Sequence, residues 1–208
     1  MIICYYSALN KPWSSDELEQ KMALIPLSVR KKILLKRNPL DVQLSVCGNL
    51  LLIELIKRFE LNLNLEDLRY NSYQRPYFDT GFDFNISHSG NMVVCCATDN
   101  GKVGIDIELT GPVNFNYEDY FTPTEQKNIR ANENPDSTFF KYWTRKEAVL
   151  KAIGTGVHTS LLAIDVSADS FVYEGVTYHL SPIEIDRAYQ SCIAHTVEQE
   201  IHVQRILL

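Results

Sequence analysis

Residues 82–108 of the chain, FDFNISHSGNMVVCCATDNGKVGIDIE, carry its strongest structural signal. Two short polar segments inside it, Ser-Gly-Asn and Asp-Asn-Gly, are typical of tight turns. The runs beside these turns are rich in β-prone residues: Phe82–Ser87, Met92–Thr98 and Val103–Glu108. Because short turns join antiparallel strands, the pattern predicts three consecutive strands of one antiparallel sheet.

Helices are predicted on the N-terminal side of this stretch. After a short strand at 2–6, Ser14 and Glu17 have the spacing of a capping box, which begins a helix. A basic helix is expected over 28–37. Apolar residues at the helical period then predict a long core helix from Leu40 to about Phe59.

The C-terminal part repeats a similar order of elements. Thr122 at the N-cap, Pro123 and Glu125 predict the start of one helix, and a second is expected from Asp136 to Ile153. β-prone runs follow at 161–166, 170–181, 191–197 and 200–207. The order predicts an α+β protein of two similar halves, 1–100 and 101–208.

Composition limits the classes of function. The chain has 208 residues, 45% of them hydrophobic, which suits one globular body or two small ones. A net charge of −6 argues against broad binding of nucleic acid or anionic membrane. Residues 1–6 lack the basic start and small-residue cleavage site of a signal peptide, and no apolar run is long enough to span a bilayer, so we expect a cytoplasmic protein.

The cysteines and histidines show no metal-site spacing. An odd number of cysteines in apolar surroundings predicts buried free thiols in a reducing compartment. They are Cys4, Cys47, Cys95, Cys96 and Cys192. None of the five histidines is spaced as in a zinc motif.

Two carboxylates alternate on the predicted strand 103–108. Alternate side chains share a face, so Ile105 and Ile107 are expected to point into a core while Asp106 and Glu108 project together. Such a pair can flank one cation. The alternative is an ordinary half-exposed strand with acidic residues facing outward.

A second candidate site lies on the helix predicted over 136–153. Glu147 and Lys151 are four residues apart and share one helix face. They form either a surface ion pair or, because the helix is apolar around much of its circumference, a partly buried pair that needs a metal or phosphate partner. The turn 84–90, with Ser87 and His88, likewise reads as a phosphate cradle or as a turn held by its own side-chain hydrogen bonds.

Four motifs taken together resemble the 4′-phosphopantetheinyl transferases of the larger, single-chain type. They are Phe84-Asn-Ile-Ser-His-Ser-Gly90, Val103-Gly-Ile-Asp-Ile-Glu108, Phe121-Thr-Pro-Thr-Glu125 and Trp143-Thr-Arg-Lys-Glu-Ala-Val-Leu-Lys151 followed by Gly154 and Gly156. Each motif alone is unspecific, but their order and spacing are specific. The resemblance covers about residues 20–156 and implies two pseudo-equivalent α/β halves with the active site between them.

The resemblance implies a reaction and a metal. Phosphopantetheine would pass from coenzyme A to a serine of an acyl or peptidyl carrier protein, which releases adenosine 3′,5′-bisphosphate. Asp106, Glu108 and Glu147 would hold Mg²⁺, with Mn²⁺ as an alternative, since oxygen ligands suit such cations. Glu147 would be the general base, and Lys151 would assist the departing phosphate. A chain that contains both halves needs no partner to form the cleft, so a monomer is expected.

Coenzyme A carries several phosphates, and the resemblance implies cationic and hydroxyl contacts for them. The implied contact residues are Arg30, Lys31, Lys32, Ser45, Arg75, Ser87, His88, Asp106 and Lys151. For Arg30–Lys32 the alternative is a solvated helix face. Three positions depart from the family: Gln74 stands where glycine is common, and Leu44 and Thr155 stand where basic residues are frequent.

The polar loop 110–120 lies between the acidic strand and the next helix. In the family this region helps to form the carrier-protein surface, so Phe115, Tyr117 and Tyr120 are either exposed anchors or inward-packed rings. Two rival functions remain open for the whole chain. One is a Mg²⁺-dependent phosphoester hydrolase that uses water as the nucleophile; the other is a catalytically silent module that binds coenzyme A or a carrier protein.

Overall fold

A computed structural model describes residues 1–156 and 159–208 of the chain. Five α-helices are described: α1 (Ser15–Ala23), α2 (Leu27–Ile33), α3 (Pro39–Arg58), α4 (Pro123–Ala131) and α5 (Pro135–Ile153). The strands are β1 (Ile2–Ala8), β2 (Arg69–Tyr70), β3 (Pro76–Tyr77), β4 (Asp83–Ser89), β5 (Met92–Thr98), β6 (Val103–Leu109), β7 (Ser170–Tyr173), β8 (Val176–Pro182), β9 (Tyr189–His195) and β10 (Ile201–Arg205). The α+β class predicted from the sequence is confirmed.

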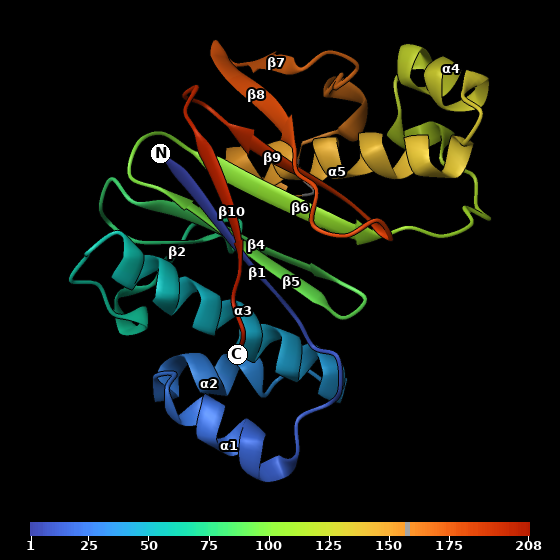
Figure 1. Ribbon diagram of the computed structural model, residues 1–208. Helices are drawn as coiled ribbons and strands as arrows, with labels where there is room; N and C mark the ends of the chain where they lie inside the picture. The colour runs from blue at the N-terminus through green and yellow to red at the C-terminus, as the bar shows by residue number, and fades with distance from the viewer. Residues whose placement is uncertain (157–158) are drawn as a thin grey trace.

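The first large sheet has the strand order β10-β1-β5-β4. β1 pairs antiparallel with β5, β5 pairs antiparallel with β4, and β10 pairs parallel with β1. The long helix α3 covers one face of this sheet (Figure 1). By length and composition α3 resembles a membrane span, but its apolar residues, including Val46, Leu51 and Leu55, are buried in the core against the sheet.

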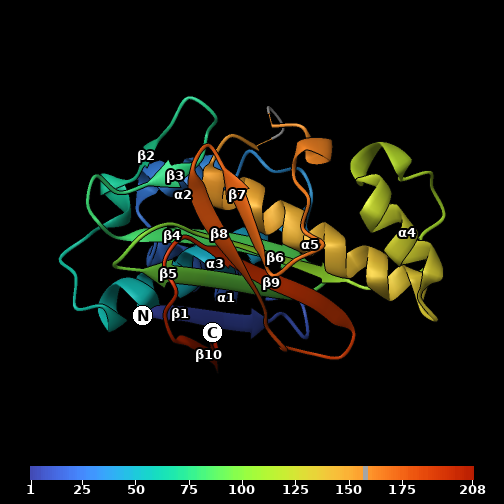
Figure 2. The ribbon, with the colours of Figure 1, turned by 90° about the horizontal axis from the view of Figure 1, so that it is seen from above.

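The second large sheet has the strand order β6-β9-β8-β7 and is antiparallel throughout. Helix α5 packs on β6 and β9 (Figure 1), as α3 packs on the first sheet. In the first sheet β1 lies beside β5, and in the second sheet β6 lies beside β9. The two sheets enclose an apolar cluster that includes Ile2, Val94, Ile105 and Ile193. Seen from above, β8 of the second sheet crosses over strands of the first sheet (Figure 2).

The sheets meet most closely where β4 runs beside β6. Side chains of β4 replace the usual backbone ladder: Asp83, Asn85 and Ser89 accept hydrogen bonds from the backbone N–H groups of Val103, Ile105 and Leu109, at 2.9, 3.1 and 3.0 Å. The constant offset of twenty residues shows that the two strands run parallel. These bonds fix the two sheets in register along the junction.

This junction corrects one prediction. The sequence predicted three consecutive strands of one antiparallel sheet, but only β4 and β5 pair in that way. β6 pairs instead with β9 in the second sheet. Both faces of β6 are buried because it lies between α5 and the first sheet, and its backbone partners on the β4 side are side-chain oxygens.

Two further predictions were wrong, one in the end of a helix and one in the type of element. The basic helix ends at Ile33 rather than at 37, because Asn38 must leave the helical conformation to cap α3 before Pro39. The run 161–166 is not a strand: residues 161–163 form a 3-10 turn, and the buried Lys146 binds the carbonyls of Leu161 and Ile164.

The other expected elements are confirmed within one or two residues, except that the run 170–181 forms two strands, β7 and β8, which pair as an antiparallel hairpin. Ser14–Glu17 and Thr122–Glu125 form the two predicted capping boxes, and Gly154 ends α5 with a left-handed φ of 82°. All five cysteines are free and buried. The division at residue 100 falls in the turn between β5 and β6 and stays a prediction; β10, from the second segment, lies in the first sheet.

Candidate active site

The acidic face of β6 forms one wall of the site. Ile105 and Ile107 are fully buried on the other face, as the alternation predicted, and Asp106 is only 3% exposed. Two β4 hydroxyls reach these carboxylates: Ser87 Oγ donates to Asp106 Oδ1 at 2.9 Å, and Ser89 Oγ donates to Glu108 Oε2 at 2.7 Å. The two serines of the 84–90 motif therefore bind the two carboxylates of the β6 motif across the junction.

Helix α5 forms the opposite wall. Trp143, Glu147 and Lys151 follow each other at four-residue intervals and so share the face above β6. Lys151 Nζ donates to Asp106 Oδ1 at 2.6 Å and to Ser87 Oγ at 2.9 Å. Lys151, Asp106 and Ser87 thus form one closed network of hydrogen bonds that joins α5, β6 and β4.

Gly104 permits this close packing. A Cβ at this position would lie 2.1 Å from the carbonyl oxygen of Ala148 and 2.4 Å from the nitrogen of Ala152. The backbone of α5 therefore lies directly on β6. This contact brings the one-turn segment Glu147–Lys151 within reach of the β6 carboxylates.

Burial and mutual charge shift the titration of all three carboxyl groups upward. Burial raises the pKa of Asp106, although the ammonium of Lys151 opposes the shift. Burial and then the charge of Asp106 raise the pKa of Glu108. The pKa of Glu147 rises for the same two reasons, with Glu108 adding to the effect. The site concentrates negative charge around Asp106.

The carboxylates fit a hard divalent cation in their chemistry, although they do not form a ready cluster. Within residues 1–156 and 159–208, no three His, Cys, Asp or Glu side chains are arranged as a metal-binding group. Lys151 already occupies Oδ1 of Asp106, but the buried Oδ2 has no hydrogen-bond partner. An unpaired buried acceptor beside two further carboxylates suits an oxygen-binding cation such as Mg²⁺.

A cavity of about 270 Å³ opens beside this network. Glu147 and Lys151 lie on one side of it, and the turn Tyr73–Pro76 lies on the other. Gln74 in that turn has a left-handed φ of 66°, the conformation that a glycine adopts without cost. The departure from the family pattern at this position therefore places a non-glycine residue where the backbone favours glycine.

A second cavity, of about 200 Å³, adjoins the first, since Pro76 lines both. Lys32, Lys36 and Ser45 are among its lining residues, and Lys32 Nζ lies 3.3 Å from the ring centroid of Tyr70. Burial and then the charge of Lys36 lower the pKa of the nearby His88. Two of the predicted coenzyme A contacts, Lys32 and Ser45, therefore lie together with Lys36 in a groove whose lining is otherwise mostly apolar.

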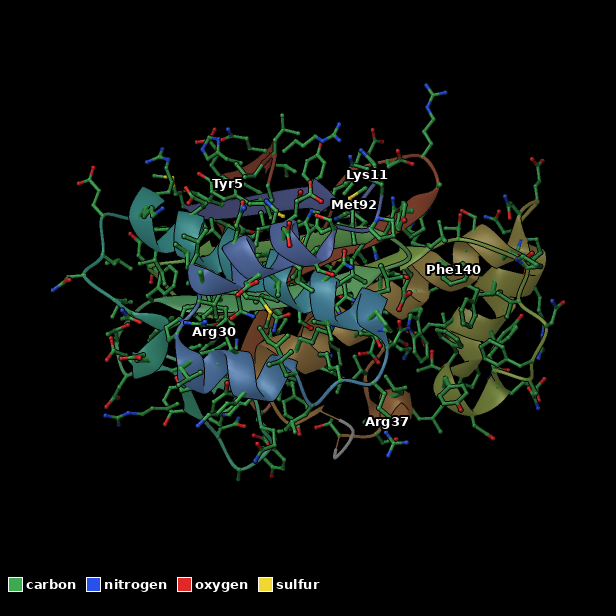
Figure 3. The ribbon with its side chains drawn as sticks, turned by 90° about the horizontal axis from the view of Figure 1, so that it is seen from below. Tyr5, Lys11, Arg30, Arg37, Met92 and Phe140 are labelled. Carbon is green, nitrogen blue, oxygen red and sulfur yellow. The ribbon has the colours of Figure 1, made fainter. Side chains whose placement is uncertain are left out.

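The other two predicted cations of the basic helix lie elsewhere. Arg30 donates to the carbonyl of Ile25 and lines a separate groove with Leu27, and Lys31 is exposed. Figure 3 shows Arg30 on the α2 side of the molecule. The structure thus separates Lys32 from Arg30 and Lys31, because successive residues of a helix point in different directions.

Arg75 also has partners within the chain. It forms an ion pair with Asp83, with N–O distances of 2.9 and 2.8 Å, and is only 11% exposed. Of the other departures, Leu44 is buried in the core between α3 and the first sheet, and Thr155 Oγ1 lies 2.7 Å from Thr159 Oγ1. Neither the Leu44 nor the Thr155 side chain therefore points freely into the groove that Lys36 lines.

Sequence reasoning missed Lys36 and Asn85 as site residues. Lys36 was visible as part of a basic run, but only the end of α2 at Ile33 turns the next residues toward the groove. Asn85 lines the first cavity and accepts from Ile105 N–H at 3.1 Å. Its position two residues before Ser87 on a strand, and hence on the same face, was the available signal.

Other residues of the motifs hold the structure rather than the site. Lys146 and Glu125 form a fully buried ion pair at 2.8 Å. Arg145 donates to Asp169 at 2.6 Å and to the carbonyl of Val166. These side chains attach α4 and the segment 161–169 to α5.

The aromatic residues of loop 110–120 are partly packed. Tyr117 contacts the rings of Phe121 and Phe139, at 5.8 and 5.2 Å between centroids. Phe115 and Tyr120 also touch this cluster but remain 56% and 39% exposed. Tyr117 is therefore packed inward, whereas Phe115 and Tyr120 are exposed, and their role as anchors stays a prediction.

Comparison with known proteins identifies the family. A family model described as the 4′-phosphopantetheinyl transferase superfamily matches residues 102–202. The 4′-phosphopantetheinyl transferase Sfp of Bacillus subtilis is 30% identical over 200 residues, which cover 91% of this chain and 84% of that protein. The 4′-phosphopantetheinyl transferase gsp of Aneurinibacillus migulanus is 37% identical over 126 residues, 58% of this chain and 52% of its own length. The chain, three of whose four motifs meet at the junction of β4, β6 and α5, belongs to the 4′-phosphopantetheinyl transferase superfamily.

Proposed function

We propose that the protein transfers 4′-phosphopantetheine from coenzyme A to a serine of an acyl or peptidyl carrier protein. The observation that supports this most directly is the network of Lys151, Asp106 and Ser87 beside Glu147. It joins a cation to carboxylates at the mouth of a cavity, as transfer of a charged phosphoryl group requires.

The reaction breaks a phosphoanhydride bond and makes a phosphate ester bond. The carrier serine oxygen bonds to the β-phosphorus of coenzyme A, the bond from that phosphorus to the bridging oxygen breaks, and adenosine 3′,5′-bisphosphate leaves. The serine proton must be taken up as the new bond forms. Glu147 is the acceptor that the geometry supports, since its carboxylate makes no hydrogen bond or ion pair within the described residues, and its raised pKa suits a base.

Lys151 acts on the departing group. Its side chain is 27% exposed and lines the cavity, so the ammonium can stabilise negative charge on the leaving phosphate while Asp106 and Ser87 hold it in place. When bound, Mg²⁺ would neutralise diphosphate charge. Asp106, Glu108 and Glu147 would hold it, with the unpaired Oδ2 of Asp106 as the first ligand.

The groove with Lys32, Lys36 and Ser45 is the proposed site of the coenzyme A 3′-phosphate. The groove adjoins the cavity at Pro76, so one extended nucleotide spans both. His88 is the proposed fourth contact. The exposed Phe115 and Tyr120 supply part of the proposed carrier surface. We propose that the chain acts as a monomer in the cytoplasm, since one chain supplies both walls of the site.

Intact-mass spectrometry of an apo carrier protein tests this function. After incubation with the protein, coenzyme A and Mg²⁺, we expect the carrier to gain one phosphopantetheinyl group, and EDTA to abolish the gain. Coenzyme A breakdown without carrier modification would instead support the hydrolase. Neither reaction across several unrelated carriers would support the silent binding module.

A further inference from the structure

The guanidinium of Arg75 is bound on several sides by its own chain. Nη1 and Nη2 donate to the two carboxylate oxygens of Asp83 at 2.9 and 2.8 Å. Two parallel bonds between planar groups fix orientation as well as distance. Asp83 is 3% exposed, so this pair is shielded from solvent and is not an incidental surface contact.

The same guanidinium reaches two other elements. Nε donates to the carbonyl of Lys151 at 2.9 Å, and Nη2 donates to the carbonyl of Val103 at 3.1 Å. Asp83 Oδ2 in turn accepts from Val103 N–H at 2.9 Å. The pair therefore connects the start of β4, the start of β6 and the last turn of α5.

The end of α5 leaves room for this contact. A Cβ at Gly154 would lie 2.7 Å from Arg75 Cδ, and Asn71 Nδ2 donates to the Gly154 carbonyl at 2.9 Å. The turn that carries Arg75 thus packs against the C-terminus of α5. The carbonyl that Arg75 holds belongs to Lys151, whose ammonium binds Asp106.

We infer that Arg75 is a positioning residue: clamped by Asp83, it fixes the last turn of α5 on β6 so that Lys151 reaches Asp106, and it does not bind a substrate phosphate. Its bonds to Asp83, Lys151 and Val103 use four of the five N–H donors of a guanidinium. This inference replaces the contact with coenzyme A that the family resemblance implied for Arg75. The measurement of kcat that tests this inference rests on the proposed function, because it follows the transfer of phosphopantetheine.

Three variants separate the two roles. Arg75→Lys keeps a positive charge for a phosphate but cannot form the paired bonds to Asp83; Arg75→Ala removes both, and Asp83→Asn removes the partner. We expect each to lower kcat about 10- to 100-fold, the scale of a small misplacement of catalytic groups. Coenzyme A affinity, measured by calorimetry, should stay within about twofold.

Non-additivity completes the test. If Arg75 and Asp83 act as one unit, the double variant Arg75→Ala/Asp83→Asn should lose no more kcat than either single variant. Arg69→Ala is the matched control, because the Arg69–Asp79 pair has the same 2.8 Å separation but is 61% and 70% exposed. We expect this control to behave as wild type.

Several results would overturn the inference. These are weaker coenzyme A binding in Arg75→Ala that Arg75→Lys restores, unchanged kcat in folded variants, or additive losses. If the wild-type protein transfers no phosphopantetheine, the proposed function fails separately. In that case two other measurements test the inference. In a double-mutant cycle of unfolding in urea, additive destabilisation by the Arg75 and Asp83 variants would overturn it. In calorimetry, loss of coenzyme A binding in Arg75→Lys and Arg75→Ala would also overturn it.

Discussion

Glu147 is a half-buried carboxyl group held beside two other carboxylates. Its raised pKa means that the folded chain binds this proton more tightly than the unfolded chain does. The stability that this provides is fully present below the ordinary glutamate pKa and is lost as pH rises through the raised value. Near neutral pH the ionised group therefore destabilises the metal-free fold.

Replacing this carboxyl group should stabilise the protein. We expect Glu147→Gln to raise the melting temperature in EDTA at pH 7 by on the order of 1–3 °C, with the gain shrinking as pH falls toward about 4. Scanning calorimetry across this pH range measures the effect, with the exposed Glu133→Gln as control. A lower melting temperature, or a gain that does not depend on pH, would contradict the electrostatic account.

Single residues also show which site features were predictable. The alternation of Asp106 and Glu108 with two isoleucines placed both carboxylates on one face, and the structure agrees. The partner of Arg75 was not predictable, because nothing in the local pattern distinguishes Asp83 from a phosphate as its anion. Whether a cation is paired within the chain depends on the tertiary arrangement.

At the scale of elements, the contact of α5 with β6 determines whether the site exists. It depends on the missing side chain of Gly104, since any Cβ there would overlap the α5 backbone. We expect Gly104→Ala to destabilise the fold by about 1–3 kcal/mol, the usual range for overpacking, and to reduce activity. Urea denaturation measures the first effect. Gly111→Ala, where no atom lies within 4 Å, is the control and should behave as wild type; equal stability of the two variants would refute this packing role.

The buried Lys146 fixes α5 to its other neighbours. Lys146→Met leaves Glu125 charged and buried without its partner, which typically costs about 3–5 kcal/mol. Lys141→Met, on an exposed position of the same helix, is the matched control. The account fails here if both variants unfold at the same urea concentration.

The starts of helices could be predicted from the sequence more readily than the partners of strands. Capping boxes at Ser14 and Thr122 were identified because a cap is a local pattern. The pairing of β6 with β9 was missed because strand partners are chosen over long distances in sequence. The turn after β5 suggested a third hairpin strand, and only the buried contacts of β6 on both faces explain its place in the second sheet.

At the scale of the whole molecule, the two sheets meet along β4 and β6, and the proposed chemistry lies at that junction. Ser87 and Ser89 come from the first sheet, Asp106 and Glu108 from the second, and Lys151 from the helix above it. The sequence motifs indicated these residues and the family. The closed network among them, and the cavity beside it, required the three-dimensional structure.

The rate at which an apo carrier protein becomes phosphopantetheinylated tests the central claim most directly. With coenzyme A and Mg²⁺ present, we expect wild type and Glu133→Gln to modify the carrier at equal rates. Glu147→Gln should be slower by at least about 10²-fold, the effect of losing a preorganised catalytic group, while remaining folded. A folded Glu147→Gln variant that works at the wild-type rate would contradict the assignment of this junction as the active site.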